Sequence, residues 1–357
     1  MSTASGAIAT GYRDGYIHVR GQRLHYVDYG GDGEALVGLH GLIQNAHAFD
    51  AIAPILVPHV HLFSFDLRGR GDSDWGPPER YTWKYYMADL VGLLAELGLS
   101  RFALIGSSLG GLLALMYGIA HPDRVTRLVL NDIALDMNFA GLLRATGRYA
   151  YVPLAKVALD HMSPTAATPA APLPAPQASD EQIHAAVERL SDEEVDALLS
   201  QMLNEEIDEF ANLAEAIAWF VARRDGIECL DDEARAAWVS HYLTPTPSGG
   251  LRFNCDPAVR DPNVMASMVG AGLPWSPGRR GWEQIKRLTM PVLILRGALS
   301  DVLLPESAER LAQWLPDARW LEVPGAGHSP TLYEPEARAA LRDFFGADLS
   351  DPAPLIP

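Results

Sequence analysis

The first third of the chain alternates short apolar runs with turns and with segments of helical periodicity. Short apolar runs bounded by Gly, Pro, Asn or Asp are typical of buried strands. They predict strands at Tyr16–Arg20, Arg23–Tyr29, Ala35–Leu39, His61–Phe65, Phe102–Ile105 and Arg127–Leu130. Apolar residues that recur every three or four positions predict a helix over Trp83–Leu97, and a second helix is expected over Leu109–Ala120.

This alternation stops near Ile133 and resumes after Met290. Between these points, the proline-rich stretch Ser163–Ala178 predicts a loop or an extended linker, and the patterns that follow it are helical. After Met290 the sequence predicts a strand, a helix, a strand and a helix, at Val292–Leu295, Pro305–Leu315, Trp320–Val323 and Glu334–Phe345.

Strands that alternate with helices predict right-handed crossovers and a mostly parallel sheet with helices on both faces. Because the same rhythm occurs on both sides of the interruption, we expect one α/β core that carries an inserted segment. The expected parts are the first half of the core at 1–132, a helical insertion with its Pro/Ala-rich linker at 133–285, the second half of the core at 286–350, and a tail at 351–357.

The charge balance narrows the choice of partners. The chain has 28 Lys and Arg against 45 Asp and Glu, a formal net charge of −17. An acidic protein is a poor partner for nucleic acid or an anionic membrane surface, because phosphate binding needs a basic surface. We therefore expect a small-molecule substrate and neither a nucleic-acid nor a membrane partner, and a homo-oligomer is compatible with the sequence.

Cysteine usage and the N-terminal residues indicate the compartment. Cys229 and Cys255 are the two cysteines in the sequence, which is too few for a disulfide scaffold. The N-terminal stretch has neither a basic start nor an apolar run of signal-peptide length, and no apolar run approaches the ~20 residues that cross a bilayer. A cytoplasmic protein is therefore expected.

The segment LIGSSLGGLLAL contains the pattern Gly-x-Ser-x-Gly, with Ser108 at its centre. A strand that turns into a helix within about one residue strains the backbone at that centre and lifts its hydroxyl above the sheet. Gly106 and Gly110 remove side chains that would collide as the strand and helix close up. Ser108 is the expected nucleophile, and Ser107 is expected to face away from the apex of the turn.

A serine hydroxyl needs a base, and the base needs an acid that holds its tautomer. His328 lies in a Gly-rich loop after the predicted strand Trp320–Val323, where it can lean over the carboxyl edge of the sheet. Asp301 follows the strand Val292–Leu295 at the same edge and is the expected acid. Asp132, at the end of an earlier strand, is the alternative acid.

A tetrahedral oxyanion needs hydrogen-bond donors. The backbone N–H of Leu109, directly after the nucleophile, is one candidate donor. The backbone N–H of Leu42, in the turn LHGL after the strand Ala35–Leu39, is the second candidate. Chemistry of this kind requires neither a metal nor an organic cofactor, so none is expected.

Together, the order Ser108, Asp301, His328, the LHGL turn and the segment FDLRGRGDSDW resemble the α/β-hydrolase superfamily. The resemblance covers about Tyr16–Asp132 and Thr289–Phe345. It implies the α/β-hydrolase fold, with the insertion as a helical cap domain over the nucleophile. Dehalogenases and epoxide hydrolases of this fold carry an aspartate where this chain has serine, so the resemblance favours serine-dependent esterases, lactonases and cofactor-free haloperoxidases.

The expected reaction is hydrolysis of a carboxylic ester or lactone through an acyl-enzyme. The insertion contains four tryptophans that suit an apolar or aromatic substrate, namely Trp219, Trp238, Trp275 and Trp282. Carbon–carbon hydrolysis or a lyase reaction on the same three residues is an alternative. A slow-turnover ligand receptor of the same fold is a second alternative.

Overall fold

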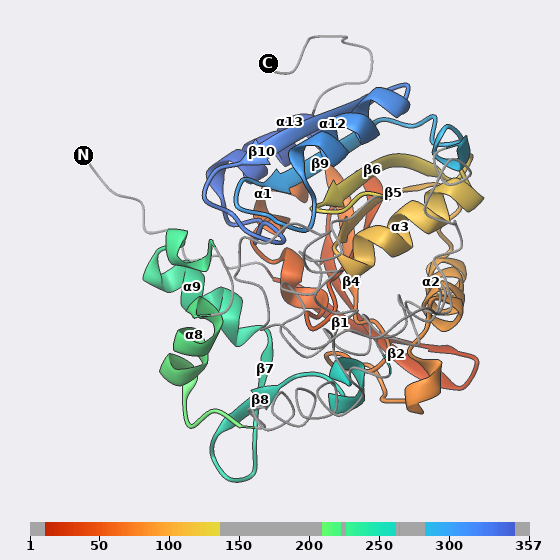
Figure 1. Ribbon diagram of the computed structural model, residues 1–357. Coiled ribbons are helices and arrows are strands. Elements are labelled where there is room, and N and C mark those ends of the chain that lie inside the picture. The colour runs from red at the N-terminus through yellow and green to blue at the C-terminus, as the bar shows by residue number, and fades with distance from the viewer. Residues whose placement is uncertain (1–10, 136–208, 223–225, 262–263, 265–282, 347–357) are drawn as a thin grey trace, which may run out of the picture.

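The computed structural model describes residues 11–135, 209–222, 226–261, 264 and 283–346. In this part of the chain, an eight-stranded sheet has the order β1-β2-β4-β3-β5-β6-β9-β10 (Figure 1). The strands are β1 (Arg13–Val19), β2 (Gln22–Gly30), β3 (Glu34–Leu39), β4 (Val60–Phe65), β5 (Phe102–Ser107), β6 (Val125–Asn131), β9 (Val292–Gly297) and β10 (Ala318–Val323).

The strands from β4 to β10 in this order run parallel, whereas β2 pairs antiparallel with both β1 and β4. Parallel strands place their carboxyl ends at one edge of the sheet. The register sets Ser107 of β5 beside Asn131 of β6, and Asn131 beside Leu295 of β9. The residues that follow these three strands therefore meet at a single edge.

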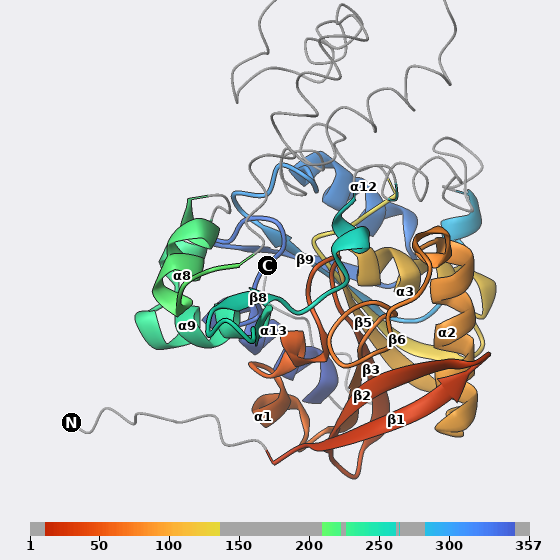
Figure 2. The ribbon, with the colours of Figure 1, turned by 90° about the horizontal axis from the view of Figure 1, so that it is seen from below.

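Helices cover both faces of the sheet, as the sequence predicts. The helices α2 (Trp83–Glu96), α3 (Leu109–Ala120) and α12 (Pro305–Trp314) pack in one hydrophobic cluster. The helices α1 (Ala53–Leu56) and α13 (Pro335–Gly346) pack in the other (Figure 2). Within β5, Leu104 belongs to the first cluster while Ala103 and Ile105 belong to the second. This alternation explains why the central strands read as continuous apolar runs.

The described part of the insertion lies beside the core, with its two α-helices at the left of both views. It comprises α8 (Leu213–Val221), the 3₁₀ turn η4 (Ile227–Cys229), α9 (Asp232–Ser240), β7 (Leu243–Pro245), β8 (Leu251–Phe253) and η5 (Pro257–Arg260). The antiparallel pair of β7 and β8 was not expected in a helical insertion, because three-residue strands are too short to show a period of two. The residues after β8 run along the core, where Gly71 N–H donates to Asn254 O.

The α/β-hydrolase fold predicted from the sequence is confirmed, and α3 has the predicted bounds. The sequence patterns do not predict three short elements of the core, namely α1, η1 (Ala46–Phe49) and η2 (Pro78–Arg80). The predicted linker Ser163–Ala178 lies outside the described residues, and the domain boundaries stay a prediction. Among the described residues, no helix combines the length and apolar character required to cross a membrane.

Candidate active site

Ser108 occupies a strained turn between β5 and α3. Its φ is 48° and its ψ is −113°, a left-handed conformation that serine rarely adopts. Close approach of the flanking segments enforces this turn: a Cβ on Gly106 would strike the backbone of Gly110, and a Cβ on Gly110 would strike the carbonyl oxygens of Leu39 and His40. The two glycines therefore permit the helix to start directly above the sheet, as the sequence predicts.

Ser108, His328 and Asp132 form a continuous hydrogen-bonded relay. The Oγ of Ser108 lies 2.9 Å from Nε2 of His328. The Nδ1 of His328 lies 2.6 Å from Oδ2 of Asp132. A carboxylate on Nδ1 fixes that nitrogen as the donor, which leaves the lone pair of Nε2 directed at the serine hydroxyl. This arrangement can take up a proton from Ser108.

Asp132 is fully buried and is held by two further donors. Gly297 N–H donates to Oδ1 at 2.9 Å, and the hydroxyl of Ser300 donates to Oδ2 at 2.5 Å. Its backbone has a φ of 59°, a left-handed conformation that Asp tolerates better than most residues. Its two oxygens accept hydrogen bonds from Gly297, Ser300 and His328, so both oxygens of this buried side chain have partners.

The expected acid, Asp301, is not the residue that the structure places on Nδ1 of His328. The loop after β9 turns so that Ser300 reaches the buried Asp132, while Asp301 is partly exposed. Because β6 and β9 are neighbours, an aspartate after either strand meets the same edge. The geometry therefore favours the alternative acid, Asp132. The sequence patterns identify neither Gly297 nor Ser300 as a partner of the acid, and the signal for Ser300 is its position directly before Asp301.

The two expected oxyanion donors lie in segments that are fixed at this edge. Leu109 is the first residue of α3. The first hydrogen bond of the helix runs from Leu112 N–H to Ser108 O, so the N–H of Leu109 has no acceptor within the helix. The peptide that follows Leu42 is held by Arg70, whose Nε donates to Leu42 O at 2.8 Å. On the other side of Leu42, Gly41 N–H donates to Oε1 of Gln44 at 2.7 Å.

His40 orients the same loop through hydrogen bonds of both its ring nitrogens. Its Nδ1 donates to Gly41 O at 2.7 Å, and its Nε2 accepts from Leu67 N–H at 2.9 Å. Only a neutral imidazole can donate from Nδ1 and accept at Nε2 at the same time, because protonation of Nε2 would remove the acceptor. Complete burial lowers the pKa of His40 to about 4, consistent with a neutral ring.

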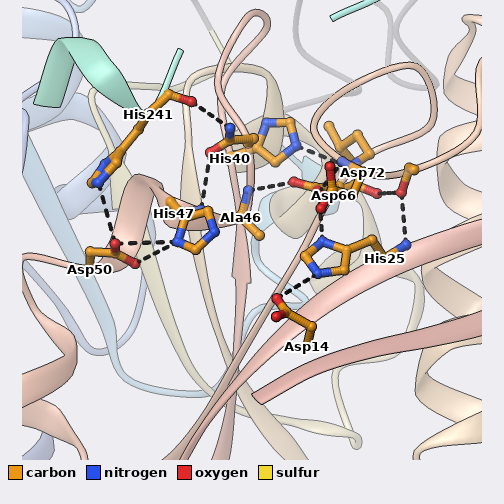
Figure 3. A network of polar contacts seen from close by, with 12 residues as sticks. Asp14, His25, His40, Ala46, His47, Asp50, Asp66, Asp72 and His241 are labelled. Atoms are coloured by element: carbon orange, nitrogen blue, oxygen red, sulfur yellow. Dashed lines mark hydrogen bonds and ion pairs between the residues drawn. The ribbon is translucent and has the colours of Figure 1, made fainter. Parts of the chain in front are cut away.

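A polar network extends from this loop to the first two strands (Figure 3). Oδ1 of Asp66 accepts from Ala46 N–H at 2.6 Å, and its Oδ2 lies 2.7 Å from Nδ1 of His25. Burial lowers the pKa of His25, but the hydrogen bonds of Asp66 and Asp14 and the charges of Asp66 and Asp72 together outweigh it, and the net shift is upward. Asp66 directly follows β4. Its hydrogen bond from Ala46 N–H therefore links the segment after His40 to the end of β4.

Two of the four insertion tryptophans can be placed. Trp238 is 2% exposed, and it packs edge-on against Phe220. Trp219 contacts the rings of Phe220 and Phe253. These contacts give both tryptophans a packing role in the insertion, and Trp275 and Trp282 lie outside the described residues. Within the described ranges, no group of three or more His, Cys, Asp or Glu is arranged to hold a metal ion.

The chain is similar to known proteins over most of its length. Residues 34–335 match the family described as alpha/beta hydrolase fold. A 3-hydroxybutyrate-oligomer hydrolase of Cupriavidus necator is 26% identical over 326 residues, which cover 90% of this chain and 92% of that protein. An N-formylmaleamate deformylase of Pseudomonas putida is 34% identical over 118 residues, 33% of this chain and 44% of that protein. A solved alpha/beta hydrolase of Novosphingobium aromaticivorans has a TM-score of 0.69 at 26% identity, and the match covers 94% of this chain and 98% of that one.

Proposed function

The chain belongs to the α/β-hydrolase family, and on this premise we propose that it is a serine hydrolase that cleaves a carboxylic ester or a lactone of a small molecule. The observation that carries the proposal is the relay from Ser108 Oγ through His328 to Asp132, with contacts of 2.9 Å and 2.6 Å. A hydroxyl in this setting is an activated nucleophile for acyl carbon.

In the proposed first half-reaction, Ser108 attacks the carbonyl carbon while Nε2 of His328 takes the hydroxyl proton. Asp132 stabilises the imidazolium that forms, and the amides of Leu42 and Leu109 donate to the oxyanion. Collapse of the tetrahedral intermediate expels the alkoxide, which receives the proton from His328. The product of this half-reaction is an alcohol and an ester of Ser108.

In the second half-reaction, water takes the place of the alcohol. His328 removes a proton from water as it attacks the acyl-enzyme, and then returns that proton to Ser108 Oγ. The carboxylic acid is released, and the relay is restored to its starting state. For a lactone, the alcohol and the acid remain part of one molecule.

Two further observations support an ester or lactone. The residue at the turn is a serine, whose acyl ester is readily hydrolysed by an activated water. The relative from Cupriavidus necator, which matches along most of both chains, is named for hydrolysis of 3-hydroxybutyrate oligomers. Units of a hydroxy acid are joined in oligomers by carboxylic esters, the bond proposed here.

Steady-state turnover of short p-nitrophenyl esters and of a panel of simple lactones tests the proposal. The wild-type protein is expected to release product through many cycles, and Ser108→Ala is expected to release it at the rate of the buffer blank. Ser64→Ala, which changes a buried serine of β4, a strand separated from β5 by β3, is the matched control and is expected to retain wild-type turnover. An active Ser108→Ala protein, or a wild-type protein with no turnover of any ester or lactone, contradicts the proposal.

A further inference from the structure

Each member of the relay has a sequence neighbour in a second, buried hydrogen-bonded group. Ser107 precedes Ser108, Asn131 precedes Asp132 and Ser329 follows His328. These three neighbours, here called the companion network, are 2%, 0% and 5% exposed. They lie on three segments that the sheet brings to one edge: the end of β5, the end of β6 and the loop after β10.

The contacts within the companion network are direct. Nδ2 of Asn131 donates to Oγ of Ser107 at 2.6 Å and to the carbonyl oxygen of Pro330 at 2.9 Å. The Oγ atoms of Ser107 and Ser329 are 3.2 Å apart. Because Oγ of Ser107 accepts from Asn131, its own hydroxyl proton is available to Oγ of Ser329. The chain of donors then runs from β6 through β5 to the loop that carries His328.

Hydrogen bonds of this kind fix distances that the relay requires. The loop of His328 belongs to neither β5 nor β6, yet two contacts of the companion network hold the residues directly after His328 against the ends of both strands. Ser107 is the last residue of β5, and Ser108 lies in the turn that follows it. The two neighbouring serines therefore contact the loop at successive residues, Ser107 at Ser329 and Ser108 at His328.

We propose that Ser107, Asn131 and Ser329 are positioning residues, which set the separation between Ser108 Oγ and His328 Nε2. This inference rests on the proposed function of that relay. Small misplacements of reacting groups reduce rates strongly, because proximity and alignment supply much of the acceleration. Binding of substrate depends less on this separation, so the companion network is expected to act on kcat and to leave KM nearly unchanged.

The test is a double-mutant cycle on kcat for p-nitrophenyl acetate with Ser107→Ala, Ser329→Ala and the double variant. Rates are expressed per active site, counted by labelling with a fluorophosphonate probe, so that a loss of folded protein does not enter. Each single variant is expected to lose about tenfold in kcat with KM within about twofold of wild type. The double variant is expected to lose about as much as Ser107→Ala alone, since both substitutions remove the hydrogen bond between Ser107 and Ser329.

Two control variants separate positioning from a general effect of buried serines. Ser64 is fully buried in β4, and its Oγ has no hydrogen-bond partner among the described residues, so Ser64→Ala is expected to retain wild-type kcat. Ser329→Thr keeps the hydroxyl and is expected to recover most of the activity that Ser329→Ala loses.

The outcomes distinguish the two proposals. A wild-type protein that neither labels nor turns over overturns the proposed function, and the positioning role with it. A reactive wild-type protein overturns the positioning role alone in either of two cases: single variants within twofold of wild type in kcat, or a double variant that loses about a hundredfold, the product of two independent effects.

Discussion

The Asp132 carboxylate is fully buried and lies 2.6 Å from Nδ1 of His328, a residue 196 positions away along the chain. The same oxygen accepts from the hydroxyl of Ser300, and the other accepts from Gly297 N–H. Both donors come from β9 and the loop that follows it. The acid is therefore attached to the end of β6 while its orientation is set by the next strand in the sheet.

Replacement of the two candidate acids separates their roles. Asp132→Asn is expected to lower kcat by about 10⁴-fold, because an amide cannot stabilise the imidazolium and favours the wrong tautomer of His328. Asp301→Asn, the matched control one residue from Ser300, is expected to change kcat by less than tenfold. The measurement is ester turnover by both purified variants at neutral pH. A larger loss in Asp301→Asn would return the acid to the position that the sequence first indicated.

Gly110→Ala tests the close approach of α3 to the end of β3. The added Cβ would overlap the carbonyl oxygens of Leu39 and His40, both backbone atoms that cannot swing aside. We expect a loss of about 1–3 kcal/mol in the free energy of unfolding, together with a fall in kcat as Ser108 is displaced. Gly76→Ala is the control, since its Cβ would meet only Oε1 of Gln22, at 3.6 Å. Equal stabilities of the two variants, measured by urea denaturation, would refute the steric argument.

His40 is expected to make stability depend on pH. Its pKa is about 4 in the folded protein against an ordinary 6.5, so between these values the unfolded chain binds a proton that the folded chain does not. The free energy of unfolding therefore falls as the pH falls through this window, by about 2 kcal/mol between pH 7 and pH 5 from this group.

His40→Gln removes this titration while keeping an oxygen that can accept from Leu67 N–H. Urea denaturation at pH 7 and pH 5 is expected to show a smaller loss of stability for His40→Gln than for the wild type, by about 2 kcal/mol. Parallel losses in the two proteins would show that His40 titrates alike in the folded and unfolded states.

The buried ion pair of Arg68 and Asp89 is expected to be a strong structural element. Nε and Nη2 of Arg68 each lie 2.6 Å from one oxygen of Asp89, and the two residues are 3% and 1% exposed. Asp89→Ala leaves a buried guanidinium without its counter-charge, which costs about 3–5 kcal/mol. Glu283→Ala, which removes the exposed partner of Lys286, is expected to cost less than about 1 kcal/mol. Similar denaturation midpoints for the two variants would contradict the role of burial.

Local chemistry explains which features the sequence predicts well. The turn at Ser108 depends on glycines two positions to either side, and α3 starts directly after it, so both are visible in one short stretch. The strands β3, β5 and β9 are buried on both faces, and their continuous apolar runs identify them.

Long-range register explains what the sequence leaves open. Asp132 and Asp301 follow adjacent strands, and the choice between them depends on how the loop after β9 folds over β6. The contact of Ser107 with Ser329 joins positions 222 residues apart and has no local pattern. The strands β7 and β8 have three residues each, too few for a period of two to appear.

The most direct test of the central claim is to locate the covalent adduct after treatment with a fluorophosphonate, by peptide mass spectrometry. The account predicts one phosphonylated residue, Ser108, and strongly slowed labelling in His328→Ala because the nucleophile loses its base. An adduct on Ser107 or on any other residue, or labelling of His328→Ala at the wild-type rate, would contradict it.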